Sequence, residues 1–184
     1  MRKIVAGLFI SLDGVVEAPD KWHFPYFNDE MGEAVGSQMA AADTMLLGRV
    51  TYQDFAGYWP HQNSDENEIA DHMNNTPKVV VSTTLDAVEW QNSTLIKDNV
   101  AEELTKLKRQ PGKEIGITGS ATLVRSLLRD GLLDELRLLV HPIVVGAGKR
   151  LFADGEPRTP LKLVDSKTFG STGVIYLTYQ PAGR

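Results

Sequence analysis

The sequence predicts an α/β fold with a mostly parallel central sheet, helices on both faces and a C-terminal antiparallel hairpin. Short apolar runs that resemble buried strands alternate with helical patterns over most of the chain, which is typical of a parallel sheet covered by helices. Two β-rich runs, residues 160–169 and 173–180, then follow each other across a glycine-containing turn. We found no internal repeat and no linker, so we expect a single domain over residues 1–184.

The first strand is predicted at residues 3–10. Arg2 and Lys3 followed by an apolar run resemble a secretory leader, but the run is short and ends in the turn-forming sequence Ser11–Gly14 instead of a cleavage site. A buried strand explains it better. The other strands that precede the hairpin are predicted at residues 44–47, 77–83, 93–97, 113–118 and 133–141.

Helices are predicted at residues 28–42, 49–57, 65–74, 99–109 and 119–130. In the helix over 99–109, Asn99 and Glu102 have the spacing of a capping box, and Pro111-Gly112 ends the segment. Its apolar stripe consists of Val100, Leu104 and Leu107. The helix over 119–130 has one apolar face and ends at Gly131.

The composition limits the classes of function. A net charge of −5 without a long basic run disfavours nucleic acid and anionic membrane surfaces as partners. The absence of cysteine excludes disulfides, thiol nucleophiles and cysteine-ligated metal sites, and it agrees with a cytoplasmic protein. No segment approaches the length of a membrane span. The four histidines lack metal-ligand spacing, so we expect no metal.

Two predicted strands end in glycine at the start of a helix, at Gly48 and at Gly119. The unpaired N–H groups of a helix N-terminus attract phosphate, and glycine permits a close approach to the backbone. Hydroxyls at Ser120 and Thr122 would add donors at one turn, and Arg49 could bind phosphate in bidentate fashion at the other. The pair therefore predicts a dinucleotide site. Glycine turns and Ser or Thr caps also occur without any ligand.

The strand over 77–83 bears on the choice of cofactor. It ends in Ser82-Thr83-Thr84 instead of the acidic residue that commonly reads the ribose of NAD. These hydroxyls, together with Arg49, favour NADPH over NADH. Asp86 is close enough in sequence to leave NADH open.

These motifs resemble the dihydrofolate reductase-like fold and, more closely, the RibD C-terminal domain family of riboflavin-biosynthesis reductases. The resemblance covers essentially the whole chain. The most specific motif is Asp134-Glu-Leu-Arg-Leu138 followed by the segment from His141 to Phe152. The other matching segments are Ser11–Gly14, Leu47–Tyr52, Val80–Ser82 and Gly116–Ser120.

The resemblance implies an NADPH-dependent oxidoreductase similar to 5-amino-6-(5-phosphoribosylamino)uracil reductase, acting on a small heterocyclic or ribosylamino substrate. It also implies a homodimer formed through the C-terminal sheet. The segment 11–16 would be a mobile lid, and Asp13, Gly146 and Gly148 would lie on the substrate side. The implied cofactor-binding residues are Ala6 (through its backbone), Gly48, Arg49, Thr51, Ser82, Thr83, Thr118, Gly119, Ser120, Ala121, Thr122 and Leu123.

The reaction also needs a proton donor for the reduced C=N or C=O group. The candidates near the lid are Asp13 and the acidic residues at the start of the helix over 28–42, which are Asp29, Glu30 and Glu33; of these we select Asp13 and Glu30. Both have ordinary structural explanations, because Asp-Gly forms turns and acidic residues in a first turn interact with the helix dipole.

Two alternatives remain for the function. One is dihydrofolate reductase activity, and the other is a non-catalytic nucleotide-binding dimer. The aromatic segment from Trp22 to Phe27 is equally open, because it could stack on a planar substrate or close the loop onto the core as a hydrophobic plug.

Overall fold

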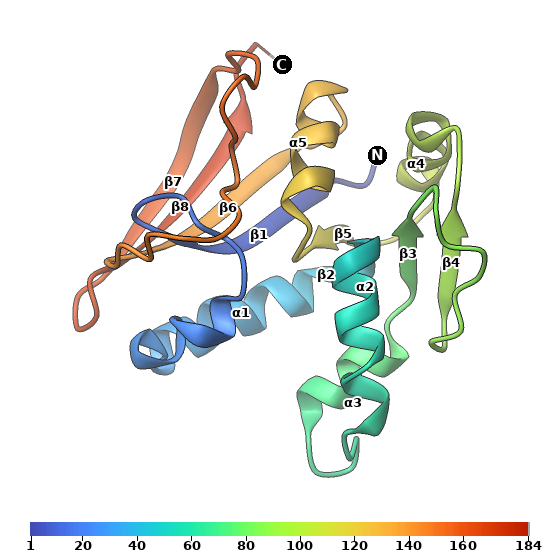
Figure 1. Cartoon of the computed structure of the whole chain (residues 1–184), viewed down its shortest axis with the longest axis horizontal. Coiled ribbons are helices and arrows are strands. Elements are labelled where there is room, and N and C mark those ends of the chain that lie inside the picture. Colours follow the sequence, from blue (N-terminus) through green and yellow to red (C-terminus); the bar gives the residue numbers. More distant parts are fainter. Residues whose placement is uncertain (184) are drawn as a thin grey trace.

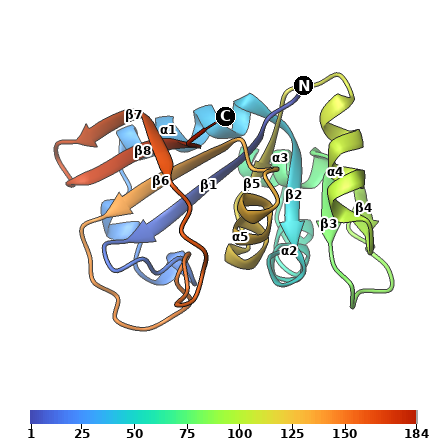
Figure 2. The same ribbon diagram turned by 90° about the horizontal axis from the view of Figure 1, so that it is seen from above.

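Eight strands form one sheet in the order β4-β3-β2-β5-β1-β6-β8-β7 in the computed structural model (Figure 1). The structure describes residues 1–183; Arg184, which the predicted domain includes, lies outside them. The strands are β1 (Ile4–Ser11), β2 (Ala42–Gly48), β3 (Lys78–Val81), β4 (Ser93–Ile96), β5 (Glu114–Ile117), β6 (Glu135–His141), β7 (Leu161–Phe169) and β8 (Val174–Pro181). Figure 2 shows the two edges, with β7 on one side and β4 on the other.

Within residues 1–183, five α-helices and three 3-10 turns connect the strands. The helices are α1 (Asp29–Ala41), α2 (Arg49–Ala56), α3 (Glu68–Asn75), α4 (Val100–Arg109) and α5 (Ala121–Arg129), and the turns are η1 (Pro19–Lys21), η2 (Phe24–Tyr26) and η3 (Trp59–His61). Every predicted helix and strand is present. The strands from β1 to β6 pair in parallel, and β8 pairs antiparallel with β6 and with β7, so the predicted fold class is confirmed.

Helices cover both faces of the sheet, as the alternation of β1 shows. Its even-numbered residues pack with Leu104 of α4 and with Val124 and Leu127 of α5. On the other face, Phe9 packs with Met31 of α1, while Tyr52 of α2 and Met73 of α3 pack over Met45 and Leu47 of β2. In Figure 1, α1 and α5 accordingly lie on opposite sides of β1.

One predicted local feature is wrong. Asn99 does occupy the N-cap position of α4, but it has a left-handed conformation, with φ 49°, and its side chain caps no amide. Asparagine tolerates this conformation better than most residues, which explains its presence without a capping box. Asn28 and Ser120, by contrast, cap α1 and α5 through their side chains.

Within residues 1–183, no helix combines the length and the apolar character that crossing a membrane requires. The longest one, α1, spans Asp29–Ala41.

Candidate active site

The two glycine turns lie side by side. Strands β2 and β5 are parallel neighbours, so the helices that follow them, α2 and α5, begin at the same end of the sheet. A Cβ added at Gly48 would lie 2.6 Å from Ser120 Oγ, and one added at Gly119 would lie 2.6 Å from Thr51 Oγ1. Each glycine therefore makes room for a hydroxyl residue of the other turn. This packing requires glycine at both positions whether or not a phosphate binds there.

The two turns differ in the backbone amides and side chains that remain free to contact a ligand. No side chain caps the start of α2 after Gly48, whereas Ser120 Oγ accepts a hydrogen bond from Leu123 N at 3.3 Å. Arg49 and Thr122 are exposed, and Arg49 donates to Gln53 at 3.0 Å. Ala121 and Leu123 are buried, and both belong to the core under α5. Their assignment as cofactor-binding residues stays a prediction.

The end of β3 lies next to the Gly48 turn, because Gly48 pairs with Val81. Ser82 is buried, and its Oγ accepts hydrogen bonds from the amides of Thr84 and Leu85 at 3.2 and 3.1 Å. The Ser82 hydroxyl thus uses its acceptor sites to stabilise the turn formed by residues 82–85. Thr83 is exposed at the same strand end and remains the more accessible of the two predicted residues.

Ala6 is fully buried, and its side chain belongs to the core cluster that contains α5. Its neighbours Val5 and Gly7 line a cavity of about 340 Å³ on the opposite face of the sheet. A ligand on that face can reach Ala6 only through the backbone, which agrees with the predicted mode of contact.

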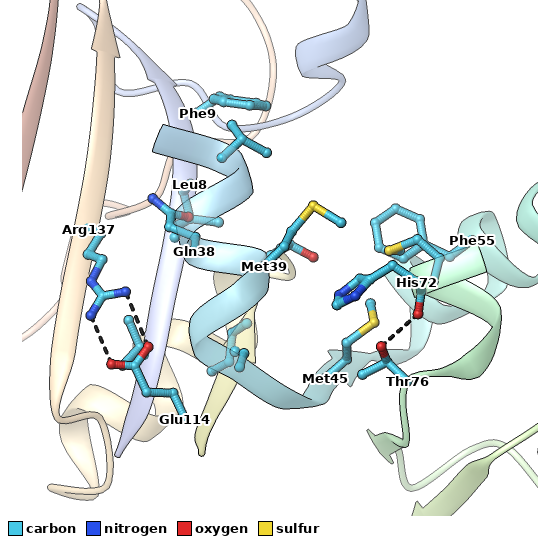
Figure 3. Close-up of a pocket in the computed structure, with 18 of the residues that line it drawn as sticks. Leu8, Phe9, Gln38, Met39, Met45, Phe55, His72, Thr76, Glu114 and Arg137 are labelled. Atoms are coloured by element: carbon cyan, nitrogen blue, oxygen red, sulfur yellow. Dashed lines mark hydrogen bonds and ion pairs between the residues drawn. The ribbon is translucent and has the colours of Figure 1, made fainter. Parts of the chain in front are cut away.

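The cavity lies between the sheet, α1 and the α2–α3 region (Figure 3). Its lining is mostly apolar, with Val35 and Met39 from α1 facing Phe55 and Met73 from the opposite wall. Val16 and Pro19 line the end of the cavity that lies next to the segment predicted as a lid, residues 11–16. Thr118, the residue before Gly119, lines it too, so the cavity adjoins the glycine turns. An apolar cavity with a few polar groups is the usual form of a small-molecule site.

Among residues 1–183, four of the polar side chains that line the cavity stand out: Gln38, His72, Glu114 and Arg137. Arg137 donates to both carboxylate oxygens of Glu114, at 3.3 and 3.0 Å, and its Nε donates to Glu135 at 2.8 Å (Figure 3). Gln38 Nε2 donates to Tyr176 Oη at 2.8 Å. The amide oxygen of Gln38 lies over Gly7, where any Cβ would meet it.

None of these four residues was predicted from the sequence as a site residue. They come from α1, α3, β5 and β6, and they share no motif. One signal was available, because Gln38 is a polar residue within the inward-facing stripe of α1 that contains Met31 and Val35. His72, one of the four histidines that lack metal-ligand spacing, points toward Met39 and Phe55 in Figure 3, and burial lowers its pKa.

Asp13 anchors one loop to another. Its carboxylate accepts hydrogen bonds from Ser11 Oγ at 2.5 Å and from the amides of Val145 and Gly146 at 3.1 and 2.9 Å. The bond from Ser11, followed by those from the two amides, lowers the pKa of Asp13 to about 2. The group is therefore a carboxylate at neutral pH, which argues against its predicted role as proton donor. Asp13 and Gly146, both predicted on the substrate side, are thus in direct contact, and their role toward a substrate stays a prediction.

Glu30 lies in the first turn of α1, as expected, but it is not among the residues that line the cavity. The α1 side chains that do line it are Val35, Gln38 and Met39. A role for Glu30 in proton transfer stays a prediction without support from this geometry.

The segment predicted as a lid is paired with the loop over 143–151. Leu12 N donates to Ile143 O, Val16 N to Lys149 O, and Leu151 N to Gly14 O, all within 3.0 Å. Val15 and Arg150 form an antiparallel bridge, and Glu17 accepts a bond from the amide of Lys149. Gly148 has φ +123° and leaves room for Val15, whose Cγ1 would be 3.0 Å from an added Cβ. The two loops thus form one structural unit.

A buried histidine pair closes the neighbouring segment onto the sheet. His23 Nδ1 and His141 Nε2 are 2.9 Å apart, and His141 Nδ1 is 2.8 Å from Leu139 O. Since a carbonyl only accepts, Nδ1 of His141 is protonated and its Nε2 accepts the bond from His23. The His23 ring stacks on Phe9, which lines the cavity, at 4.0 Å. The plug interpretation therefore holds for His23 and for the buried Trp22, although Phe24 and Phe27 are exposed.

Within the described residues 1–183, no group of three or more acidic or histidine side chains is placed to hold a metal ion. The titratable side chains that line the cavity are His72, Glu114 and Arg137.

Comparisons with known proteins agree with this architecture. Residues 2–175 match the RibD C-terminal domain. The uncharacterized protein YyaP of Bacillus subtilis (strain 168) is 36% identical over 182 residues, which cover 97% of this chain and 94% of that protein. A protein from Shewanella sp. PV-4 that is named for riboflavin biosynthesis has a similar structure, with a TM-score of 0.77, 21% identity, and coverage of 98% of this chain and 99% of that one.

The dihydrofolate reductase-like fold is likewise confirmed. Dihydrofolate reductase from Enterococcus faecalis, solved in complex with NADP(H) and RAB-propyl, superimposes with a TM-score of 0.60 at 18% identity. The superposition covers 98% of this chain and 96% of the reductase.

Proposed function

The chain belongs to the RibD C-terminal domain family, and we propose that it is an NADPH-dependent reductase that transfers hydride to a C=N or C=O group of a small heterocycle. The observation that carries the proposal is the junction at Thr118. This residue lines the apolar cavity and directly precedes the Gly119 turn, which packs against the Gly48 turn. A dinucleotide held by the two turns would thus have its reactive end at the cavity.

The residues at the turns fit a phosphorylated cofactor. The amides at the start of α2 have no side-chain cap, and the exposed Arg49 stands beside them. Thr83 is exposed at the neighbouring strand end, while the carboxylate of Asp86 pairs with Lys97 at 3.5 Å. This distribution of charge favours the 2′-phosphate of NADPH. When bound, the cofactor supplies the hydride, and the protein orients it and excludes water.

His72 is the candidate proton donor. Of the titratable side chains that line the cavity in residues 1–183, Glu114 and Arg137 bind each other, whereas the His72 ring has no hydrogen-bond partner. Burial lowers the pKa of this half-buried imidazole, so at neutral pH the ring is mainly uncharged and would pass a proton to the substrate through its N–H while taking one from water at the other nitrogen. His72→Gln should lower kcat while leaving the Kd for NADPH unchanged.

Dihydrofolate reductase activity is less well supported. That family places a carboxylate on the helix after the lid, but among the described residues, the side chains that α1 directs into the cavity are apolar or, in Gln38, an amide. The α1 side of the cavity therefore lacks the carboxylate that would bind a pterin.

Calorimetric titration with NADPH and NADH, followed by measurement of NADPH oxidation with a panel of heterocycles, tests the proposal. NADPH should bind more tightly than NADH, and oxidation should require the heterocycle. Failure of both nucleotides to bind would overturn the proposed function. Binding of NADPH without turnover of any heterocycle, accompanied by dimer formation, would favour the non-catalytic alternative.

A further inference from the structure

The charges around the cavity restrict its ligand. Within residues 1–183, Arg137 is the only lysine or arginine that lines it. Its guanidinium is already bound by Glu114 through two hydrogen bonds and by Glu135 through a third. We infer that the substrate is an electrically neutral ring that carries no phosphate group. The inference rests on the proposed function and narrows it, since the resemblance also allows a ribosylamino phosphate.

A phosphate in this cavity would lack a partner. Protein sites for phosphate supply free arginine or lysine side chains or backbone amides, because a desolvated anion without them is strongly destabilised. Here a phosphate would have to displace Glu114 from Arg137, and it would then face two carboxylates in a region of low dielectric constant. At the end of the cavity next to the 11–16 segment, the lining residues are Val16 and Pro19, and the basic side chains of the paired loop, Lys149 and Arg150, are exposed and do not line the cavity.

Gln38 indicates what the neutral ring presents. Its Nε2 is committed to Tyr176 Oη, which fixes the amide plane and leaves Oε1 directed over Gly7. This oxygen accepts no hydrogen bond from any residue in 1–183, and it borders the cavity floor. An unpaired acceptor beside an apolar wall recognises an N–H donor such as that of a lactam or an amino group on the ring. A Cβ at position 7 would lie 2.3 Å from this oxygen, so a larger residue there would have to displace the end of the Gln38 side chain.

The test compares 5-amino-6-(ribosylamino)uracil with its 5′-phosphate as ligands, each titrated by calorimetry in the presence and absence of NADP⁺. The neutral compound should bind at least about tenfold more tightly than the phosphate, equivalent to about 1.4 kcal/mol. Equal or tighter binding of the phosphate, or failure of both to bind, would overturn the inference. A protein that fails to bind NADP⁺ but discriminates between the two ligands would contradict the proposed function and not this inference.

Two variants locate the effect. Glu114→Gln releases Arg137 from one carboxylate, so it should raise the affinity for the phosphate relative to the neutral compound by roughly tenfold. Gln38→Leu removes the hydrogen-bond acceptor and should lower the affinity for the neutral compound by about tenfold or more. Gln110→Leu, an exposed glutamine at the end of α4, is the matched control and should change neither affinity. Thermal melting of each variant verifies folding, and unchanged ratios in the two cavity variants would also overturn the assignment.

Discussion

Gly48 and Ser120 pack so closely that a Cβ on the glycine would lie 2.6 Å from the serine Oγ. Gly48→Ala should therefore destabilise the fold by about 1–3 kcal/mol, because the added methyl overpacks the contact between the turns. Combining it with Ser120→Gly, which costs the N-cap only a few tenths of a kcal/mol, should recover most of the loss. Chemical denaturation of the wild type, the two single variants and the double variant gives the free energies of unfolding for this double-mutant cycle. Gly36→Ala, at a helical position with open space, should be neutral or stabilising, and additive losses in the double variant would contradict the packing argument.

Arg49→Ala should lower the affinity for NADPH by roughly 10- to 100-fold and the affinity for NADH much less, because the lost side chain pairs with the 2′-phosphate. Isothermal titration with both nucleotides gives the ratio. The exposed Arg158→Ala serves as the control for loss of one positive charge. Equal weakening of the two nucleotides by Arg49→Ala would assign this arginine to a phosphate that both cofactors share.

Asp13→Asn should lower stability at neutral pH and increase hydrogen exchange at the amides of Val145 and Gly146. The folded-state pKa of Asp13 is lowered to about 2 from 3.8, so its carboxylate contributes stability above pH 3.8, and the contribution is lost as pH falls through about 2. The difference between wild type and variant should shrink accordingly in acid. The exposed Asp154→Asn is the control, and a difference that does not depend on pH would contradict the role of the charge.

The free energy of unfolding should fall as the pH is lowered from about 6.5 to about 4. Burial, followed by repulsion from His141, lowers the pKa of His23 to about 4, so the unfolded chain binds a proton in this range that the folded chain rejects. The contribution is at most roughly 3 kcal/mol. Urea titrations across the range measure it. His23→Phe should flatten the slope and the exposed His61→Phe should not; equal slopes in all three proteins would refute the assignment.

The chain should form a homodimer through the edge of the sheet at β7 and β8. Most of β7 is exposed, and Leu163, Val164 and Ile175 present apolar surface there. Sedimentation velocity should give a dimer, and Leu163→Lys with Ile175→Lys should convert it to a monomer that still binds NADPH. A wild-type monomer at micromolar concentration would refute this interface.

The fold was predictable because the elements depend on local patterns. Apolar runs bounded by glycine, such as Glu114–Ile117 before the Gly119 turn, define the strands, and the stripe through Val100, Leu104 and Leu107 defines α4. The capping box predicted at Asn99 is wrong because residue spacing alone does not reveal a left-handed backbone conformation.

The cavity was harder to predict. Glu114 and Arg137 meet across β1, which lies between their strands, and such a contact depends on register and not on any motif. Asp13 was predicted as a proton donor, but its hydrogen-bond partners, the amides of Val145 and Gly146, lie more than 130 residues away along the chain. Its role as a loop anchor could therefore be recognised only in three dimensions.

The backbone pairing between Ser11–Glu17 and residues 143–151 has a kinetic consequence. A ladder of main-chain hydrogen bonds opens cooperatively, so neither segment can move away from the sheet without the other. Amide protons of Val16 and Leu151 should thus exchange with solvent at a common rate.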